Sequence, residues 1–188
     1  MILKKLEKYL EFEKVDKNIF DIIIYGSLVK GKYEPRDIDI LVIFLEGNLK
    51  ERLEKIQEIK INLKKLEDAD FDIKQILLKD LFSSEFMARA GIFLEGISIF
   101  RKKKFCETLG FKSYSLFYYN MKNLSHTQKI KFNYILAGRK TAGIIESLNG
   151  ERLAMGAIKI PIENSFEFED LLKKNDIDYK KRNILEEL

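Results

Sequence analysis

Apolar residues recur along the first hundred positions in two patterns. Some segments place them three and four residues apart, which is typical of helices packed on a core. Others are short and almost uninterrupted apolar runs, which favour buried strands. The predicted helices are residues 2–14, 48–66 and 79–95. The predicted strands are residues 19–25, 37–44, 70–78 and 97–100.

The pattern is weaker after residue 103. Residues 113–124 and 126–148 are predicted to be helices, and Ser165 is predicted to cap a third helix at its N-terminus. RLAMGAIKIP, residues 152–161, predicts one or two strands, and the final residues carry no assignment. We therefore expect an α/β (α+β) protein, with a mixed sheet flanked by helices in residues 1–103. Residues 104–188 are expected to form a mostly helical extension and a candidate substrate-binding domain.

Length and composition narrow the class of protein. The chain has 188 residues, of which 46% are hydrophobic and 34% charged, enough for one domain or two small ones. The single cysteine, Cys106, cannot form an internal disulfide, which fits a reducing cytoplasm. Every apolar run is too short to cross a membrane, and the charged N-terminus does not resemble a signal peptide.

The strand at residues 37–44 begins unusually, with two carboxylates in DIDILVIF. Because alternate residues of a strand point to one face, Asp37 and Asp39 are neighbours on the same side. Two such charges repel each other unless a cation lies between them. Mg²⁺ prefers hard oxygen ligands of this kind together with substrate phosphates. The pair therefore predicts a metal site.

A glycine turn precedes this strand. Gly26 and Ser27 follow the strand at residues 19–25, where free backbone N–H groups and a hydroxyl suit phosphate oxygens. The same loop contains three cations that add positive charge, Lys30, Lys32 and Arg36. For Lys30 and Lys32, solvated loop charges without a specific ligand are the competing interpretation. A phosphate cradle beside a metal site has the parts that phosphoryl transfer requires.

The Gly26-Ser27 pair, nine residues and then Asp37-Ile38-Asp39 resemble the signature of the DNA polymerase beta nucleotidyltransferase superfamily. The resemblance covers about residues 15–101 and extends to the order of strands and helices. It implies that Asp37 and Asp39 hold metal ions, two Mg²⁺ or alternatively Mn²⁺. It also implies that Gly26 and Ser27 hold the triphosphate of an NTP such as ATP. Arg36 departs from the Ser or Thr of many relatives, and its charge, like that of Lys30, makes it a further candidate phosphate contact.

The superfamily uses a third carboxylate on a neighbouring strand. DADFDIK offers Asp68, Asp70 and Asp72, which all share one parity, so alternation does not choose among them. Asp72 is flanked by Phe71 and Ile73, as in a strand interior, and is the preferred candidate. By resemblance it helps to hold the catalytic metal and orients or deprotonates the attacking hydroxyl.

Charge is unevenly distributed. Residues 101–140 hold ten basic residues and one acidic residue, a net charge of +9, so with the chain at +4 the remainder carries −5. Eight aromatic residues are interleaved with these cations. Cations neutralise phosphates and aromatic rings stack on bases, so this segment is a candidate RNA contact. A core position is the competing interpretation of the same aromatic residues.

These patterns predict transfer of a nucleoside monophosphate from an NTP to an acceptor hydroxyl, with RNA, such as a tRNA 3′ end, as the favoured acceptor. The alternatives are a protein acceptor, as in toxin–antitoxin systems, a small-molecule acceptor, and a binding module that has lost catalysis. A protein partner therefore stays open. The lone His126 and Cys106 are assigned structural or surface roles, because neither has a partner for catalysis or metal binding.

Overall fold

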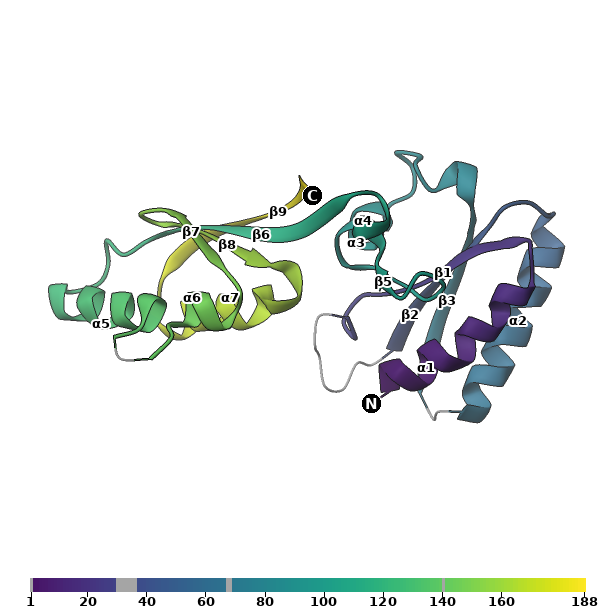
Figure 1. Cartoon of the computed structure of the whole chain (residues 1–188), viewed down its shortest axis with the longest axis horizontal. Helices are drawn as coiled ribbons and strands as arrows, with labels where there is room; N and C mark the ends of the chain where they lie inside the picture. The colour runs from purple at the N-terminus through teal and green to yellow at the C-terminus, as the bar shows by residue number, and fades with distance from the viewer. Residues whose placement is uncertain (1, 30–36, 67–68, 140) are drawn as a thin grey trace. The chain divides into compact units, whose positions relative to one another are not determined.

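The computed structural model describes residues 2–29, 37–66, 69–139 and 141–188. The chain divides into two compact units, Met1–Gly110 and Phe111–Leu188. Each unit has its own sheet, its own helices and its own hydrophobic core (Figure 1).

The first unit is built on a five-stranded mixed sheet in the order β3-β2-β1-β4-β5. Its strands are β1 (Ile19–Tyr25), β2 (Asp37–Phe44), β3 (Asp70–Leu77), β4 (Ile97–Ser98) and β5 (Lys103–Lys104). Strands β2 and β3 run parallel, and the other neighbours are antiparallel. Its helical elements are α1 (Ile2–Leu10), η1 (Glu11–Val15), α2 (Leu49–Leu66), η2 (Leu78–Asp80), α3 (Arg89–Glu95) and α4 (Phe105–Thr108).

Both faces of this sheet are covered, because β1 and β2 are apolar on both sides. Even-numbered isoleucines such as Ile24 and Ile40 pack against α1 and α2. Odd-numbered residues such as Ile23 and Leu41 pack with Ile92 of α3 and with α4. Helix α2 starts at a reciprocal cap, in which the side chains of Asn48 and Glu51 each accept the other's backbone N–H at 3.0 Å.

The second unit is an antiparallel sheet in the order β7-β8-β6-β9 with helices between its strands. Its elements are β6 (Phe111–Asn120), α5 (His126–Ala137), α6 (Ile144–Ser147), β7 (Glu151–Ala154), β8 (Ala157–Pro161), η3 (Ile162–Asn164), α7 (Ser165–Lys174) and β9 (Asp178–Glu187). Strand, helix, two strands, helix and strand in this spatial order form the split βαβ arrangement of ferredoxin-like domains.

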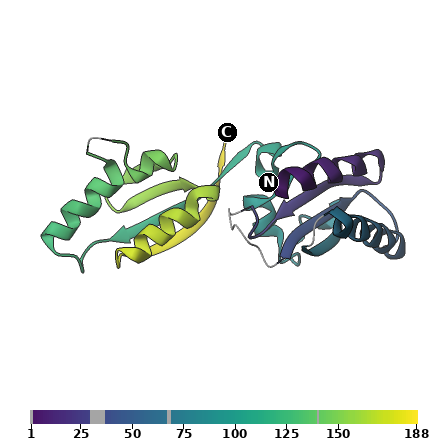
Figure 2. The ribbon, with the colours of Figure 1, turned by 90° about the horizontal axis from the view of Figure 1, so that it is seen from below.

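The three helices of the second unit lie on one side of its sheet, as Figures 1 and 2 show. Alternate residues of β6 point to that side, so Phe117 and Tyr119 are buried against α5 and α7. The rings of Phe117 and Phe168 meet edge to face at 5.0 Å. Among the described residues, no helix of this unit covers the opposite face of the sheet.

The expected fold class is confirmed, with a mixed sheet, flanking helices and a C-terminal region that contains helices. Four local predictions were wrong. The single helix expected over residues 126–148 is two helices, because α5 ends at Ala137 and α6 begins at Ile144. Residues 113–124 were expected to be a helix, but strand β6 occupies most of them. Residues 79–95 were also expected to be one helix, but they form part of η2, turns and the short α3. Ser165 is the first residue of α7, and its hydroxyl donates to the Ile162 carbonyl at 2.8 Å instead of capping the helix. The unassigned tail forms β9.

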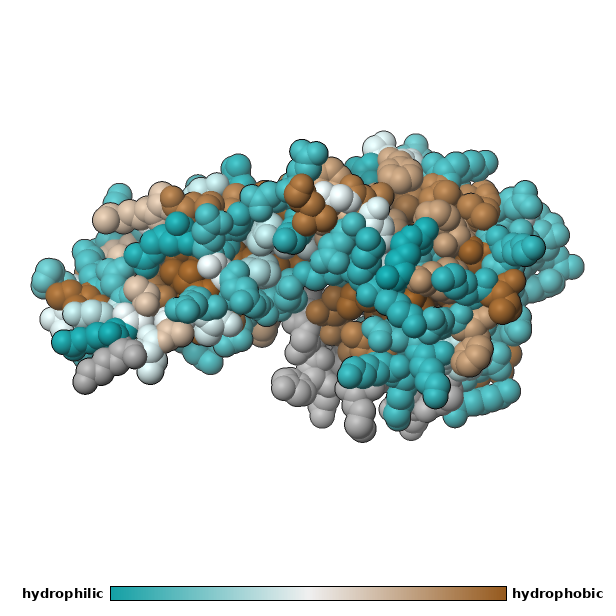
Figure 3. Space-filling model, viewed as in Figure 1, coloured by the Kyte–Doolittle hydropathy of each residue, from teal (hydrophilic) through white to brown (hydrophobic). Residues whose placement is uncertain are grey.

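Hydrophilic side chains cover much of the face seen in Figure 3, with apolar patches between them. Among the described residues, no helix combines the length and the apolar character needed to cross a membrane.

Candidate functional site

The two carboxylates predicted as metal ligands lie at the start of β2. Asp37 is exposed and Asp39 is partly buried, whereas Ile38 and Ile40 are buried in the core under α1 and α2. Alternation therefore places both carboxylates on the opposite face of the sheet, as the sequence predicted.

Strand register places a carboxylate of β3 beside each of them. Asp39 is level with Asp72 on the parallel strand β3, whereas Asp37 is level with Asp70. On its other side, Asp39 is level with Tyr25 on β1. The row Tyr25, Asp39 and Asp72 thus crosses three adjacent strands, and Asp70 is one step further out, at the first residue of β3.

The glycine turn packs closely against one of the carboxylates, that of Asp39. Gly26 has a φ of +79°, and a Cβ atom built on it would lie 2.1 Å from Oδ2 of Asp39. Only a residue without a side chain allows this approach. Ser27 is the next residue of the turn, which covers residues 26–29 without starting a helix. Lys30 and Arg36, the other predicted phosphate contacts, lie outside the described residues, as does Lys32.

Asp72 has a partner that the sequence analysis missed. The Lys74 ammonium lies 2.9 Å from Oδ2 of Asp72, and both side chains are about half exposed. This hydrogen bond raises the pKa of Lys74, against the opposing effect of burial. Among the described residues, no three His, Cys, Asp or Glu side chains converge as a ready metal cage. The Lys74 ammonium instead forms an ion pair with Asp72, one of the carboxylates predicted as metal ligands.

Tyr25 is a second residue that was missed. Its hydroxyl is buried and has no hydrogen-bond partner in the described part of the chain. Burial raises the pKa of Tyr25; Lys74 lies near enough to oppose this, and Asp39 and Asp72 add to it. Alternation along β1 and β3 was the available signal, because it places Tyr25 and Lys74 on the carboxylate face.

Asp21 is the carboxylate of β1, and its role is structural. It is fully buried, and it accepts hydrogen bonds from the Ser98 hydroxyl at 2.6 Å and from the Arg101 guanidinium. Arg101 also lies over the Phe20 ring, 4.5 Å from its centroid. These contacts fasten the short strand β4 to β1.

The basic, aromatic segment at residues 101–140 is divided between the two units. Phe105 is in the core of the first unit, and Phe117, Tyr119 and Phe132 are in the core of the second. Tyr118 and Tyr134 are the large exposed rings of the segment, at 46% and 47% exposure. Cys106 is buried, and His126 is exposed at the start of α5.

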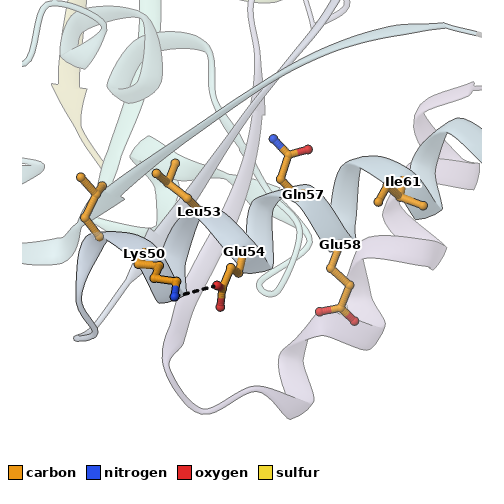
Figure 4. A pocket seen from close by; sticks show the side chains of 7 residues that line it. Lys50, Leu53, Glu54, Gln57, Glu58 and Ile61 are labelled. Carbon is orange, nitrogen blue, oxygen red and sulfur yellow. Dashed lines mark ion pairs between the residues drawn. The ribbon is translucent and has the colours of Figure 1, made fainter.

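A shallow apolar depression lies elsewhere, on the outer side of α2 (Figure 4). Leu49, Leu53 and Ile61 line it together with charged residues of the same helix. Helix α2 packs on the sheet face opposite the carboxylates, so this depression is not part of the carboxylate site.

Together, the fold and the site define a class of protein. Carboxylates suited to a metal ion and a glycine turn suited to phosphates are parts that phosphoryl transfer uses. Within that class, the model of the polymerase beta nucleotidyltransferase family matches residues 4–105, and the chain belongs to this family. It is a nucleotidyltransferase.

Comparisons with individual proteins give less information about this chain than the family model does. No curated protein matches the chain significantly. One of three matching solved chains belongs to a toxin–antitoxin crystal structure with AMP-PNP. It is 19% identical, covers 50% of this chain and 69% of its own, and has a TM-score of 0.36.

Proposed function

We propose that this nucleotidyltransferase transfers a nucleoside monophosphate from an NTP to an acceptor hydroxyl in a reaction that depends on a divalent metal. One observation carries the proposal: the Asp39 carboxylate packs against Gly26 and is level with Asp72. The turn suited to phosphates and the carboxylates suited to a metal are thereby adjacent.

The residues present fit a hard divalent cation, because carboxylate oxygens are its preferred donors. Asp37, Asp39 and Asp72 are the proposed ligands of Mg²⁺ or Mn²⁺, and Asp72 is level with Asp39. Bound metal would neutralise phosphate charge and stabilise the leaving pyrophosphate. Lys74 pairs with one oxygen of Asp72 and would compete with a metal ion for that carboxylate.

The other residues bind and orient the substrates. Backbone N–H groups at Gly26 and Ser27 hold phosphate oxygens, and Lys30 and Arg36 add positive charge. Asp72 accepts the proton of the acceptor hydroxyl, whose oxygen forms the new bond to the α-phosphorus while the bond to pyrophosphate breaks.

The acceptor in this proposal is RNA, such as the 3′ end of a tRNA, and the charge of residues 101–140 supports it. A protein acceptor, as in toxin–antitoxin systems, and a small molecule are the alternatives. Incubating the protein with Mg²⁺, RNA, cell extract and each α-³²P-labelled NTP in turn separates them. Label on RNA supports the proposal and names the base. Label on a protein or a small molecule moves the acceptor there.

The matched variant for this experiment is Asp39→Asn, which keeps volume and removes charge. We expect transfer to fall about 100-fold or more, since charge stabilisation by a metal amounts to several kcal/mol. The melting temperature should change little. Full activity in Asp39→Asn would show that the site is assigned wrongly.

A further inference from the structure

The sheet of the second unit leaves one face without helices. Its core lies on the α5–α7 side, where Phe117, Ile158 and Ile160 are fully buried. By alternation, Tyr114, Leu116 and Tyr118 of β6 point to the other side. We call this side of β8, β6 and β9 the open face.

Tyr118 is the exposed ring of the open face, with 46% of its surface accessible. Its neighbours across the sheet are the small Ala157 on β8 and Lys180 on β9. Tyr114 differs, because the Lys159 ammonium covers its ring at 4.7 Å from the centroid. Only Tyr118 of these two offers a free aromatic surface.

Two unpaired cations stand beside Tyr118. Lys181 points to the helix side, where its ammonium lies 2.9 Å from Glu169 of α7. Its neighbours Lys180 and Arg182 therefore point to the open face. Neither forms an ion pair with the described residues, whereas Lys159 on the same face is paired with Glu151 and Glu186. The free positive charge thus gathers around Tyr118.

We propose that the open face binds single-stranded RNA, with a base stacked on Tyr118 and phosphates held by Lys180 and Arg182. An exposed ring on a sheet, flanked by cations, is the arrangement in which unpaired bases stack and the backbone is neutralised. A duplex keeps its bases stacked within the helix, so it can use the cations but not the ring. The two cations beside Tyr118 fit the phosphates of a nucleic acid better than an apolar protein surface.

This inference rests on the proposed RNA acceptor and changes its location. The contact is not the whole basic segment at 101–140, because half of its eight aromatic residues are core. The proposed contact is the open face, where outward side chains of β6 lie beside those of β9. Strand β9 lies outside residues 101–140.

The test is binding of a fluorescent single-stranded RNA of about ten nucleotides to the full chain, by anisotropy without NTP and at several salt concentrations. Tyr118→Ala should weaken binding about tenfold, and Tyr118→Phe should restore it, because stacking needs only the ring. Combined Lys180→Gln and Arg182→Gln should reduce the salt slope by about 1.4. The same sequence as a duplex should show little effect of Tyr118→Ala.

Tyr134→Ala is the matched control. Tyr134 is equally exposed, at 47%, and has a guanidinium beside it, with Arg139 at 5.1 Å from its ring centroid, but it belongs to α5. The Tyr134→Ala variant should bind the single-stranded RNA as tightly as the unaltered protein does. Unchanged binding in Tyr118→Ala, equal loss in Tyr134→Ala, or no RNA binding at all would each overturn the inference.

Asp39→Asn separates this inference from the proposed function. It should bind RNA normally while losing transfer. RNA binding as expected with no label transferred from any NTP would sink the proposed function alone. Label on another acceptor with no RNA binding would overturn the inference and the RNA acceptor, and would leave metal-dependent nucleotidyl transfer standing.

Discussion

Lys74 forms an ion pair with Asp72, which is one of the proposed metal ligands. Its ammonium lies 2.9 Å from Asp72, and this hydrogen bond raises the pKa of Lys74, so the cation persists at neutral pH. Lys74→Met should therefore strengthen metal binding by a few fold, because the competing cation is gone. A titration with Mn²⁺, followed by electron paramagnetic resonance, measures this directly and without turnover.

Lys79→Met is the control for that titration, since Lys79 is an exposed lysine on η2 of the same unit. It should leave Mn²⁺ affinity unchanged. Weaker Mn²⁺ binding in Lys74→Met would mean that Lys74 supports the carboxylates instead of competing for them.

Gly26 is the second residue whose substitution has a clear expected effect. Its φ of +79° disfavours any side chain, and a Cβ there would lie 2.1 Å from Oδ2 of Asp39. Gly26→Ala should displace that carboxylate, reduce transfer at least about tenfold, and cost on the order of 1 kcal/mol of stability. Steady-state kinetics and thermal melting measure the two effects.

Gly91→Ala is a matched substitution within α3. A Cβ at Gly91 meets nothing within 4 Å, so this variant should keep full activity and become slightly more stable, since alanine favours a helix. If Gly26→Ala also kept full activity, close packing of the turn on Asp39 would be irrelevant to catalysis.

At the scale of elements, the sequence predicted the strands that carry the site because they are unambiguous. IFDIIIY and DIDILVIF are apolar on both faces, and they form β1 and β2 with the expected bounds. The Gly26, Asp37 and Asp39 spacing could be recognised from the chain alone. The preference for Asp72 over Asp70 stays a prediction, because both share one parity and each is level with one carboxylate of β2.

Strand β6 was mistaken for a helix for a physical reason. Its buried positions are Ser113, Ser115, Phe117 and Tyr119, so two of the four are small polar residues and the apolar alternation is hidden. Ser115 is accommodated by a hydrogen bond from its hydroxyl to the Asn183 side chain at 2.7 Å. Strand β9 is hidden similarly, because Lys181 faces inward to pair with Glu169.

That pairing joins α7 to β9 and predicts acid sensitivity. Burial alone would raise the pKa of Glu169, but hydrogen bonds from Lys181, Tyr179 and Lys173 outweigh it and lower the pKa to about 2, from an ordinary 4.5. A depressed carboxyl pKa stabilises the fold above the ordinary value. This stability is therefore complete above about pH 4.5 and is lost as the pH falls toward 2.

Glu169→Gln should therefore lower the free energy of unfolding at pH 7 by on the order of 1 kcal/mol, allowing for solvent screening. The difference from the unaltered protein should shrink as the pH falls from 4.5 to 2. Urea titrations across this range measure it. A difference that does not change with pH would show that the charge of Glu169 is not responsible.

At the scale of the whole molecule, the two units divide the proposed work. The family model matches residues 4–105, within the first unit, which carries the carboxylates and the glycine turn. The second unit holds the open face with Tyr118. The +9 charge of residues 101–140 belongs to parts of both units, so segment charge alone did not locate a binding surface.

The division predicts that residues 111–188 fold by themselves. Their first strand, β6, and last strand, β9, pair along ten residues each, so the sheet is complete within the segment. Phe117, Phe132 and Phe168 are fully buried in a core drawn from the same residues. We expect the fragment to unfold cooperatively with a stability of several kcal/mol, and to bind single-stranded RNA without transferring nucleotide. Circular dichroism melting and anisotropy check both, and a fragment without a melting transition would show that the second unit needs the first to fold.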